Sequence, residues 1–195
     1  MKYEEKKFNI GKLEGISEKT ISEHLKLYAG YVKHTNVILE KVSGLIENSE
    51  TQYSGQETQR RFGFEFNGMR NHEIYFSLLE NGKKDLEDDS NLKMAIEKQW
   101  GSFDIWLTEF KKIALTRGPG WSILYLDSNT NTLLNAWVDE HQIGVLSSVK
   151  PIIVLDMWEH AYFLDYSPAD KIKYIESFFA NINWSVAEDF FSSAI

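Results

Sequence analysis

Residues 156–162 have the sequence Asp-Met-Trp-Glu-His-Ala-Tyr, and this stretch constrains the fold and the chemistry of the chain more than any other. Its carboxylate, Asp156, and its imidazole, His160, are four residues apart, a spacing that lets both face one ion. The preceding residues 151–155, Pro-Ile-Ile-Val-Leu, form an apolar run typical of a buried strand. Because a carboxylate at the end of such a strand is costly to bury alone, we expect a metal ion or another cation beside it.

Two upstream histidines, His24 and His72, can complete a site with Asp156 and His160. Together the four side chains offer three neutral nitrogen donors and one anionic oxygen donor. Such a set suits a first-row transition metal such as iron or manganese better than a hard alkaline-earth ion. The chain has no cysteine, so thiolate ligands and a disulfide framework are both excluded.

The composition predicts a globular protein with a substantial core. The 195 residues are 43% hydrophobic and 14% aromatic, which is enough for one large domain or two small packed ones. The net charge of -8, without any basic cluster, argues against a nucleic-acid partner. No apolar run is long enough to span a membrane, and residues 1–9 lack the apolar segment of a secretion signal, so we expect a cytoplasmic protein.

The first half of the chain predicts two long helices. Apolar residues recur at helical spacing over residues 17–47, beginning at the N-cap residue Ser17. The polar residues 48–56 are expected to connect this helix to a second one over residues 57–79, so that the two form an antiparallel hairpin. The charge-dense residues 83–91 that follow are the expected domain boundary.

The second half mixes helical and strand patterns. Residues 92–117 predict one or two amphipathic helices, and Pro168 is placed to begin a helix that ends near Asn181, before a last helix over residues 185–192. Between these helices lie three short apolar segments rich in β-formers: residues 121–126, 133–138 and 149–155.

These elements predict an α+β fold. An N-terminal antiparallel helical hairpin domain, residues 1–84, packs on a C-terminal α/β domain, residues 85–195, which contains a three-stranded, mainly antiparallel sheet.

Several motifs resemble those of the iron/manganese superoxide dismutase family, and the resemblance covers nearly the whole chain. The family's C-terminal motif D-x-W-E-H-A-Y is intact at residues 156–162. The other matches are Asn71-His72, Gly101-Ser102-Phe103, Gly118-Pro119-Gly120-Trp121 and Asn183-Trp184. The resemblance implies a two-domain fold in which each half supplies two ligands to one iron or manganese ion, here His24, His72, Asp156 and His160.

The resemblance also implies the reaction, which is disproportionation of superoxide to dioxygen and hydrogen peroxide while the ion alternates between its trivalent and divalent states. In the family a tyrosine follows the first ligand histidine on the same helix. Here Tyr31 lies seven residues after His24, which returns it to within about 20° of His24 around a helix, so both can face one cavity. His34 is the only other nearby histidine, and we interpret it as a surface residue.

Family members often hydrogen-bond the solvent beside the metal through a side chain near the ligands. Gly68 stands four residues before His72, where iron-type members often place a glutamine, and its small size implies that the C-terminal half supplies this side chain. His141 fits that role best, and Gln142 is the alternative. Trp121 and Trp158 are expected to wall the site, and the same two residues would equally serve as ordinary core aromatics.

Two further inferences concern a second subunit and the entrance. In the family the glutamate equivalent to Glu159 contacts the ligand histidine of a partner subunit, which implies a homodimer formed through Glu159 and His160. Leu27 and Phe163 stand where members usually carry a histidine and a tyrosine, so we expect an apolar contact there and altered proton transfer. Lys171 is a candidate for the usual arginine that attracts the anion.

The native metal stays open, because Gly68 favours manganese-type members and a histidine near the metal occurs with either ion. We therefore expect activity with both metals, a cambialistic enzyme. A di-iron carboxylate protein is disfavoured, because no histidine has a glutamate three residues before it. A protein of the same fold that binds metal or a partner without turnover is the remaining alternative.

Overall fold

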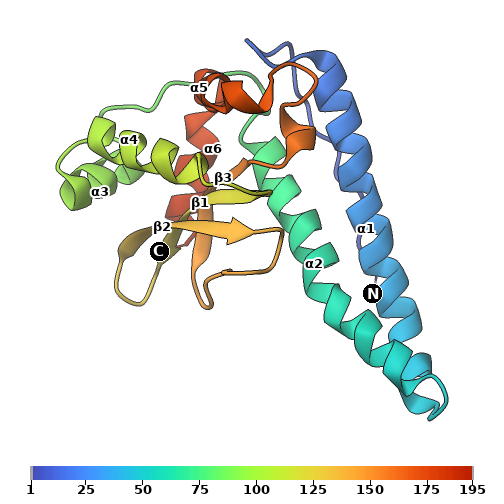
Figure 1. Cartoon of the computed structure of the whole chain (residues 1–195). Coiled ribbons are helices and arrows are strands. Elements are labelled where there is room, and N and C mark those ends of the chain that lie inside the picture. The colour runs from blue at the N-terminus through green and yellow to red at the C-terminus, as the bar shows by residue number, and fades with distance from the viewer. Residues whose placement is uncertain (1, 195) are drawn as a thin grey trace.

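The fold begins with two long antiparallel helices, as the computed structural model, which describes residues 2–194, makes clear. Helix α1 spans Glu18–Glu47 and helix α2 spans Gln52–Ser77. They lie side by side along their length and meet in a short connection at the end remote from the sheet (Figure 1). The expected cap of α1 is confirmed, since the Ser17 hydroxyl accepts a hydrogen bond from the Thr20 amide at 3.1 Å.

The predicted connection between the two helices was too long. Residues 52–56 belong to α2, so the helix begins five residues earlier than residue 57. At the turn the Thr51 hydroxyl donates to the Leu45 carbonyl at 2.9 Å, and Gly55 packs so closely on Ile46 that a Cβ would lie 2.8 Å from its Cγ1. Polar residues at the exposed end of a hairpin are compatible with a helix as well as with a loop. The composition of residues 52–56 therefore could not show where α2 begins.

The C-terminal half consists of a small sheet with helices packed around it. Strands β1 (Gly120–Asp127), β2 (Thr132–Asp139) and β3 (Lys150–Asp156) form one sheet in the order β2-β1-β3, and both pairings are antiparallel. The predicted α+β class is confirmed. The helices are α3 (Asn91–Trp100), α4 (Phe103–Ala114), α5 (Lys171–Asn181) and α6 (Trp184–Ser192), with short 3-10 turns η1 (Glu159–Ala161) and η2 (Pro168–Asp170).

The sheet delivers Asp156 to the helical hairpin. β1 is the central strand and is almost entirely buried, and its Trp121 pairs with Asp156 at the end of β3. The β3 strand packs against α2, and η1, which follows it, packs against α1. A buried strand therefore ends on a carboxylate where the two halves of the molecule meet, as the apolar run before Asp156 predicted.

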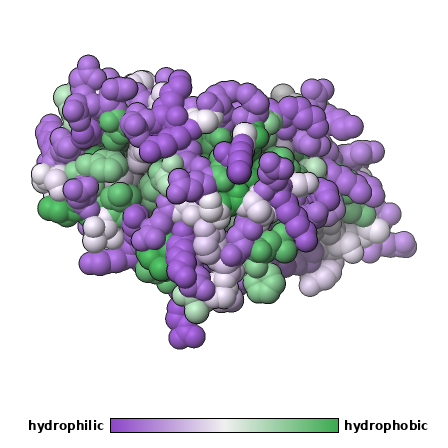
Figure 2. Space-filling view, turned by 90° about the horizontal axis from the view of Figure 1, so that it is seen from above, coloured by the Kyte–Doolittle hydropathy of each residue, from purple (hydrophilic) through white to green (hydrophobic). Residues whose placement is uncertain are grey.

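The outside of the molecule is mostly hydrophilic. On the face seen from above in Figure 2, hydrophilic residues cover most of the area and hydrophobic ones emerge in small groups between them. Within residues 2–194, no helix is both long enough and apolar enough to cross a lipid bilayer.

Candidate metal centre

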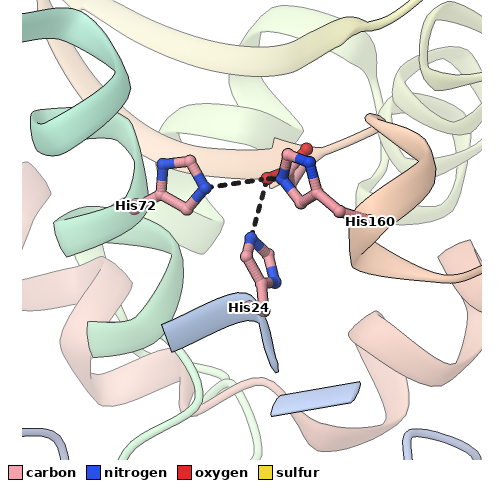
Figure 3. A group of neighbouring side chains, drawn as sticks. His24, His72 and His160 are labelled. Carbon is pink, nitrogen blue, oxygen red and sulfur yellow. Dashed lines mark hydrogen bonds and ion pairs between the residues drawn. The ribbon is translucent and has the colours of Figure 1, made fainter. Parts of the chain in front are cut away.

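Four side chains from four separate elements converge at the junction of the hairpin and the sheet. One ligand-type atom from each of His24, His72, Asp156 and His160 lies within 4.8 Å of the others. His24 comes from α1, His72 from α2, Asp156 from the end of β3 and His160 from η1. Figure 3 shows the imidazole rings of His24, His72 and His160 gathered around one point, and the distances identify the atom there as a carboxylate oxygen of Asp156.

A single oxygen lies at the centre of this arrangement. Asp156 Oδ2 is 3.0 Å from His24 Nε2, 3.2 Å from His160 Nε2 and 3.5 Å from His72 Nε2. The other oxygen, Oδ1, accepts a hydrogen bond from the Trp158 amide at 2.9 Å, which fixes the rotation of the carboxylate. Burial alone would raise the pKa of Asp156, but interactions with His160 and His24 outweigh it and hold that pKa well below its usual range.

Two of the histidines, His24 and His72, are held as neutral donors. His24 and His72 are fully buried, and burial is the first cause that lowers the pKa of both. His72 Nδ1 bonds to the Gly68 carbonyl, so this nitrogen carries the proton and Nε2 keeps its lone pair. Within residues 2–194, His72 Nε2 and His24 Nδ1 are buried without a hydrogen-bond partner. Such unsatisfied atoms are costly, and a cation bound among the four donors would satisfy His72 Nε2.

Aromatic rings enclose the cluster. Tyr75 and Phe76 from α2 lie with ring centroids 5.1 and 4.8 Å from that of His24. Trp121 meets His72 edge-on at 5.0 Å, and Trp158 stacks on His160 at 5.8 Å. Three of these rings are fully buried, and Trp158 is partly exposed, so little water reaches the four donors. A low local dielectric strengthens every charge interaction inside such a site.

A hydrogen-bonded chain runs beside the four donors. The Trp121 indole N–H donates to His141 Nδ1 at 2.9 Å, and His141 Nε2 bonds to the Tyr31 hydroxyl at 2.7 Å. Burial is the largest cause that lowers the pKa of His141 to about 4 and raises the pKa of Tyr31 above its ordinary value. His141 is therefore neutral and Tyr31 protonated at neutral pH.

The turn that presents His141 is fixed on both sides. Glu140 has a φ of 50°, the left-handed conformation that few non-glycine residues adopt. Its amide donates to the Pro119 carbonyl at 3.1 Å, and its carbonyl accepts from the Trp158 indole at 3.3 Å. These contacts turn the His141 side chain into the protein, where it stacks on Trp158 with ring centroids 4.8 Å apart.

Gly68 permits the close approach of Tyr31. A Cβ on Gly68 would lie 2.7 Å from Tyr31 Cδ1 and 2.9 Å from Cε1, distances that real Cβ atoms do not reach. The Tyr31 ring in turn stacks on His72 at 5.1 Å. The glycine thus provides the space that holds the tyrosine against one of the four donor side chains.

Other residues singled out in the sequence lie outside this chain of contacts. Gln142 turns its side chain to the backbone, accepting from the His141 amide at 3.3 Å. His34 is exposed, as predicted, and its Nδ1 lies 3.6 Å from Glu65. Glu159 is exposed beside His160. Leu27 and Phe163 are also exposed, and Lys171 lies with its Nζ 5.6 Å from the centre of the Tyr162 ring.

Sequence reasoning missed three residues at the outer side of His141. The Phe64 ring meets His141 edge-on at 4.4 Å, and the Arg61 guanidinium carbon lies 3.4 Å above the centre of that ring. Glu65, which is buried, accepts from Arg61 Nε at 3.0 Å. The available signal was spacing, since Phe64, Gly68 and His72 recur every four residues and so share one side of α2.

Comparison with known proteins agrees with this geometry. Residues 88–190 match the family model for the C-terminal domain of iron/manganese superoxide dismutases. The superoxide dismutase [Fe] of Aquifex aeolicus is 35% identical over 94% of this chain and 87% of its own length. The chain belongs to the iron/manganese superoxide dismutase family.

Relatives in the family differ in the metal that their names carry. The superoxide dismutase [Mn/Fe] of Aeropyrum pernix is 32% identical over 85% of this chain and 77% of its own length. Superoxide dismutase [Mn] 1 of Halobacterium salinarum is 32% identical over 92% of this chain and 88% of its own length. Similarity to the family therefore extends to relatives named for iron, for manganese and for both.

Proposed function

We propose that this protein is a superoxide dismutase that holds one iron or manganese ion with His24, His72, Asp156 and His160. The observation that carries the proposal is the convergence of three imidazole Nε2 atoms on one buried carboxylate oxygen, at 3.0 to 3.5 Å. The donor set of three neutral nitrogens and one anionic oxygen matches the preference of both ions. Membership of the family supports the reaction, disproportionation of superoxide to dioxygen and hydrogen peroxide.

The ion, when bound, supplies one-electron redox chemistry by alternating between its trivalent and divalent states. The protein supplies the geometry and the charge balance around it. With a single carboxylate among four donors, Asp156 offsets only part of the charge of the ion, so the site stays attractive to an anion. The Trp158 amide on Asp156 Oδ1 and the Gly68 carbonyl on His72 Nδ1 keep both ligands oriented.

Tyr31 and His141 hold the protons that the reaction consumes. Trp121 can only donate, so it fixes His141 as the tautomer with hydrogen on Nε2, and this nitrogen donates to the Tyr31 oxygen. The hydrogen of the Tyr31 hydroxyl is then free to point toward the four donors. Because the pKa of Tyr31 is raised, this group stays protonated across the neutral range and can serve as a proton donor.

We infer that either metal supports turnover. Gly68 leaves the hydrogen bonding near the ion to His141 rather than to a side chain from α2, and imidazole donors suit both metals. The names of relatives divide between iron, manganese and both. A cambialistic enzyme is the simplest outcome for such a site.

A homodimer is part of the proposal. Glu159 is exposed and directly precedes His160, whose side chain keeps 19% of its surface accessible. A second copy that placed its own Glu159 against that imidazole would orient the ligand and bury both groups. Leu27 and Phe163, 43% and 61% exposed, would supply apolar contact area at the same interface. The domain division at residue 84 and a cytoplasmic location stay predictions.

The test is metal-specific activity. Metal-free protein is loaded separately with iron and with manganese, and superoxide removal is measured per bound ion. Both forms are expected to be active, and His72→Ala is expected to lose bound metal and activity. His34→Ala removes an exposed histidine and is the matched control, which should retain both. Stoichiometric metal without superoxide removal would instead support a metal-binding protein of the same fold.

A further inference from the structure

A positively charged side chain stands at the outer side of the Tyr31–His141 pair. Arg61 lies on α2, two turns before Gly68, and its guanidinium carbon is 3.4 Å above the centre of the Phe64 ring. Phe64 is itself buried and contacts His141 at 4.4 Å between ring centroids. One aromatic ring therefore separates the charge of Arg61 from the imidazole that holds Tyr31.

Only part of this charge is compensated. Arg61 Nε donates to Glu65 Oε1 at 3.0 Å, while the two terminal nitrogens have no hydrogen bond among residues 2–194. The side chain is 54% exposed, so those nitrogens face solvent. Glu65 is only 8% exposed, and its other oxygen lies 3.6 Å from His34 Nδ1. Its carboxylate is therefore held in place beside the guanidinium of Arg61.

The charges of Arg61 and Glu65 both act on the Tyr31–His141 pair. Burial is the main cause of the raised pKa of Tyr31, but Glu65 raises that pKa further and Arg61 lowers it. Arg61 also contributes to lowering the pKa of His141, again after burial. The geometry alone has the same consequence, because a guanidinium stacked on the ring that contacts His141 favours negative charge nearby, including that of an approaching anion.

The other two arginines of α2 are already paired, and Lys171 lies elsewhere. Arg70 pairs with the buried Glu73 at 2.6 Å, and Arg60 pairs with the partly exposed Glu57 at the same distance. Lys171, the candidate from the sequence, lines a surface hollow with Arg117 that includes none of the four donor residues, nor Tyr31 or His141. Of these cations, Arg61 is the one that lies over a ring in contact with His141.

We propose that Arg61 draws the superoxide anion toward Tyr31, and that Glu65 limits how strongly it does so. Phe64 acts as the spacer between the Arg61 guanidinium and the His141 imidazole. The inference rests on the proposed function, because it assigns the guidance of that substrate to a residue of this chain. Arg61 is a positioning residue, since it acts on the approaching anion and contacts none of the four donors.

The size of the effect follows from the distance and from screening. Arg61 and an anion roughly 8 Å apart interact strongly enough to raise the local anion concentration about two- to thirtyfold at low salt, for effective dielectric constants from about 80 down to about 20. At about 0.1 M ionic strength the Debye length is about 10 Å, so much of this gain disappears. Steering by Arg61 should therefore be large at low salt and small at high salt.

The experiment compares charge variants in the metal-loaded enzyme at several ionic strengths. Arg61→Gln is expected to lower kcat/KM for superoxide about threefold or more at low salt and to flatten its salt dependence, with metal content unchanged. Glu65→Gln should raise kcat/KM at low salt and steepen its salt dependence. Arg60→Gln makes the same change in net charge one residue away and is the matched control, which should behave like the parent. Arg61→Lys keeps the charge and should retain most of the rate.

A second readout separates this inference from the proposed function. Azide, an anion of the same charge, is titrated optically against the metal-loaded variants, and its dissociation constant should rise about threefold in Arg61→Gln alone. Equal azide affinity and equal salt dependence in Arg61→Gln and Arg60→Gln would overturn the role of Arg61. A parent enzyme without superoxide removal would overturn the proposed function, while the azide titration would still decide whether Arg61 attracts anions. If Arg61→Gln does not fold, Glu65→Gln carries the test, because it should lower the azide dissociation constant and an unchanged value would overturn the role of Arg61.

Discussion

Gly68→Ala is the substitution that most sharply tests how Tyr31 is held. The added Cβ would lie 2.7, 2.9 and 3.1 Å from three carbons of the Tyr31 ring, so the ring must move. The ring cannot move far without disturbing its stacking on His72 at 5.1 Å and its 2.7 Å hydrogen bond to His141. A single methyl group is therefore expected to affect both stability and rate.

The magnitude comes from three opposing contributions. Alanine in place of glycine inside a helix contributes about 1 kcal/mol of stability. Overpacking against a buried ring costs about 1–3 kcal/mol, and a weakened buried hydrogen bond costs about 1–3 kcal/mol more. The sum is a loss of stability of about 1–5 kcal/mol, centred on about 3 kcal/mol. If about 1 kcal/mol of that loss also applies in the transition state, kcat/KM falls about fivefold.

The assay is urea unfolding of the metal-free proteins together with kcat/KM of the loaded enzymes. Gly44→Ala is the matched control, because nothing lies within 4 Å of a Cβ at that position in α1. It should be slightly more stable than the parent and equally active. If Gly68→Ala gained stability like Gly44→Ala and kept the full rate, the proposed packing of Tyr31 against Gly68 would be wrong.

Three other perturbations test separate parts of the site. Burial lowers the pKa of His141 from 6.5 to about 4, so the unfolded chain binds a proton on this residue before the folded protein does as the pH falls. Metal-free protein should therefore lose up to about 3 kcal/mol of stability between pH 6.5 and 4 that His141→Gln does not lose. Equal loss of stability in the two proteins would contradict the burial of His141. His141→Gln should also retain metal while its rate falls. Glu159→Ala should lower both the dimer fraction in ultracentrifugation and the retained metal, and unchanged values would count against the interface. Chelation of the metal should lower the melting temperature, because an ion present at on the order of 1,000 times its dissociation constant stabilises the folded protein by about 4 kcal/mol. The melting temperature of His72→Ala should not change on chelation.

The spacing of apolar residues predicted the helices and strands of this fold well, because most of them have a single buried face. The apolar positions of α1 and the short apolar strands each fit one secondary structure, and the Ser17 cap marked where α1 begins. The start of α2 was misplaced, because residues 52–56 are polar and lie on the exposed end of the hairpin, where nothing in their composition distinguishes a helix from a loop.

The candidate site was partly predictable for a similar reason. Asp156 and His160 share one short motif, and a buried carboxylate needs partners, so a cluster was expected. The tautomer of His141 could not be predicted, since it depends on the Trp121 indole that reaches it across the sheet-to-loop junction. The role of Arg61 was equally hidden, because nothing in the sequence distinguishes it from Arg60 until the ring beneath it and the imidazole beyond that ring are placed.

The most direct test of the account is anomalous diffraction from crystals of the protein loaded with manganese or iron. We predict one anomalous peak per chain, bonded to Nε2 of all three histidines and to Oδ2 of Asp156. A peak elsewhere, or a fully loaded protein in which any of these four side chains is turned away from the ion, would contradict it.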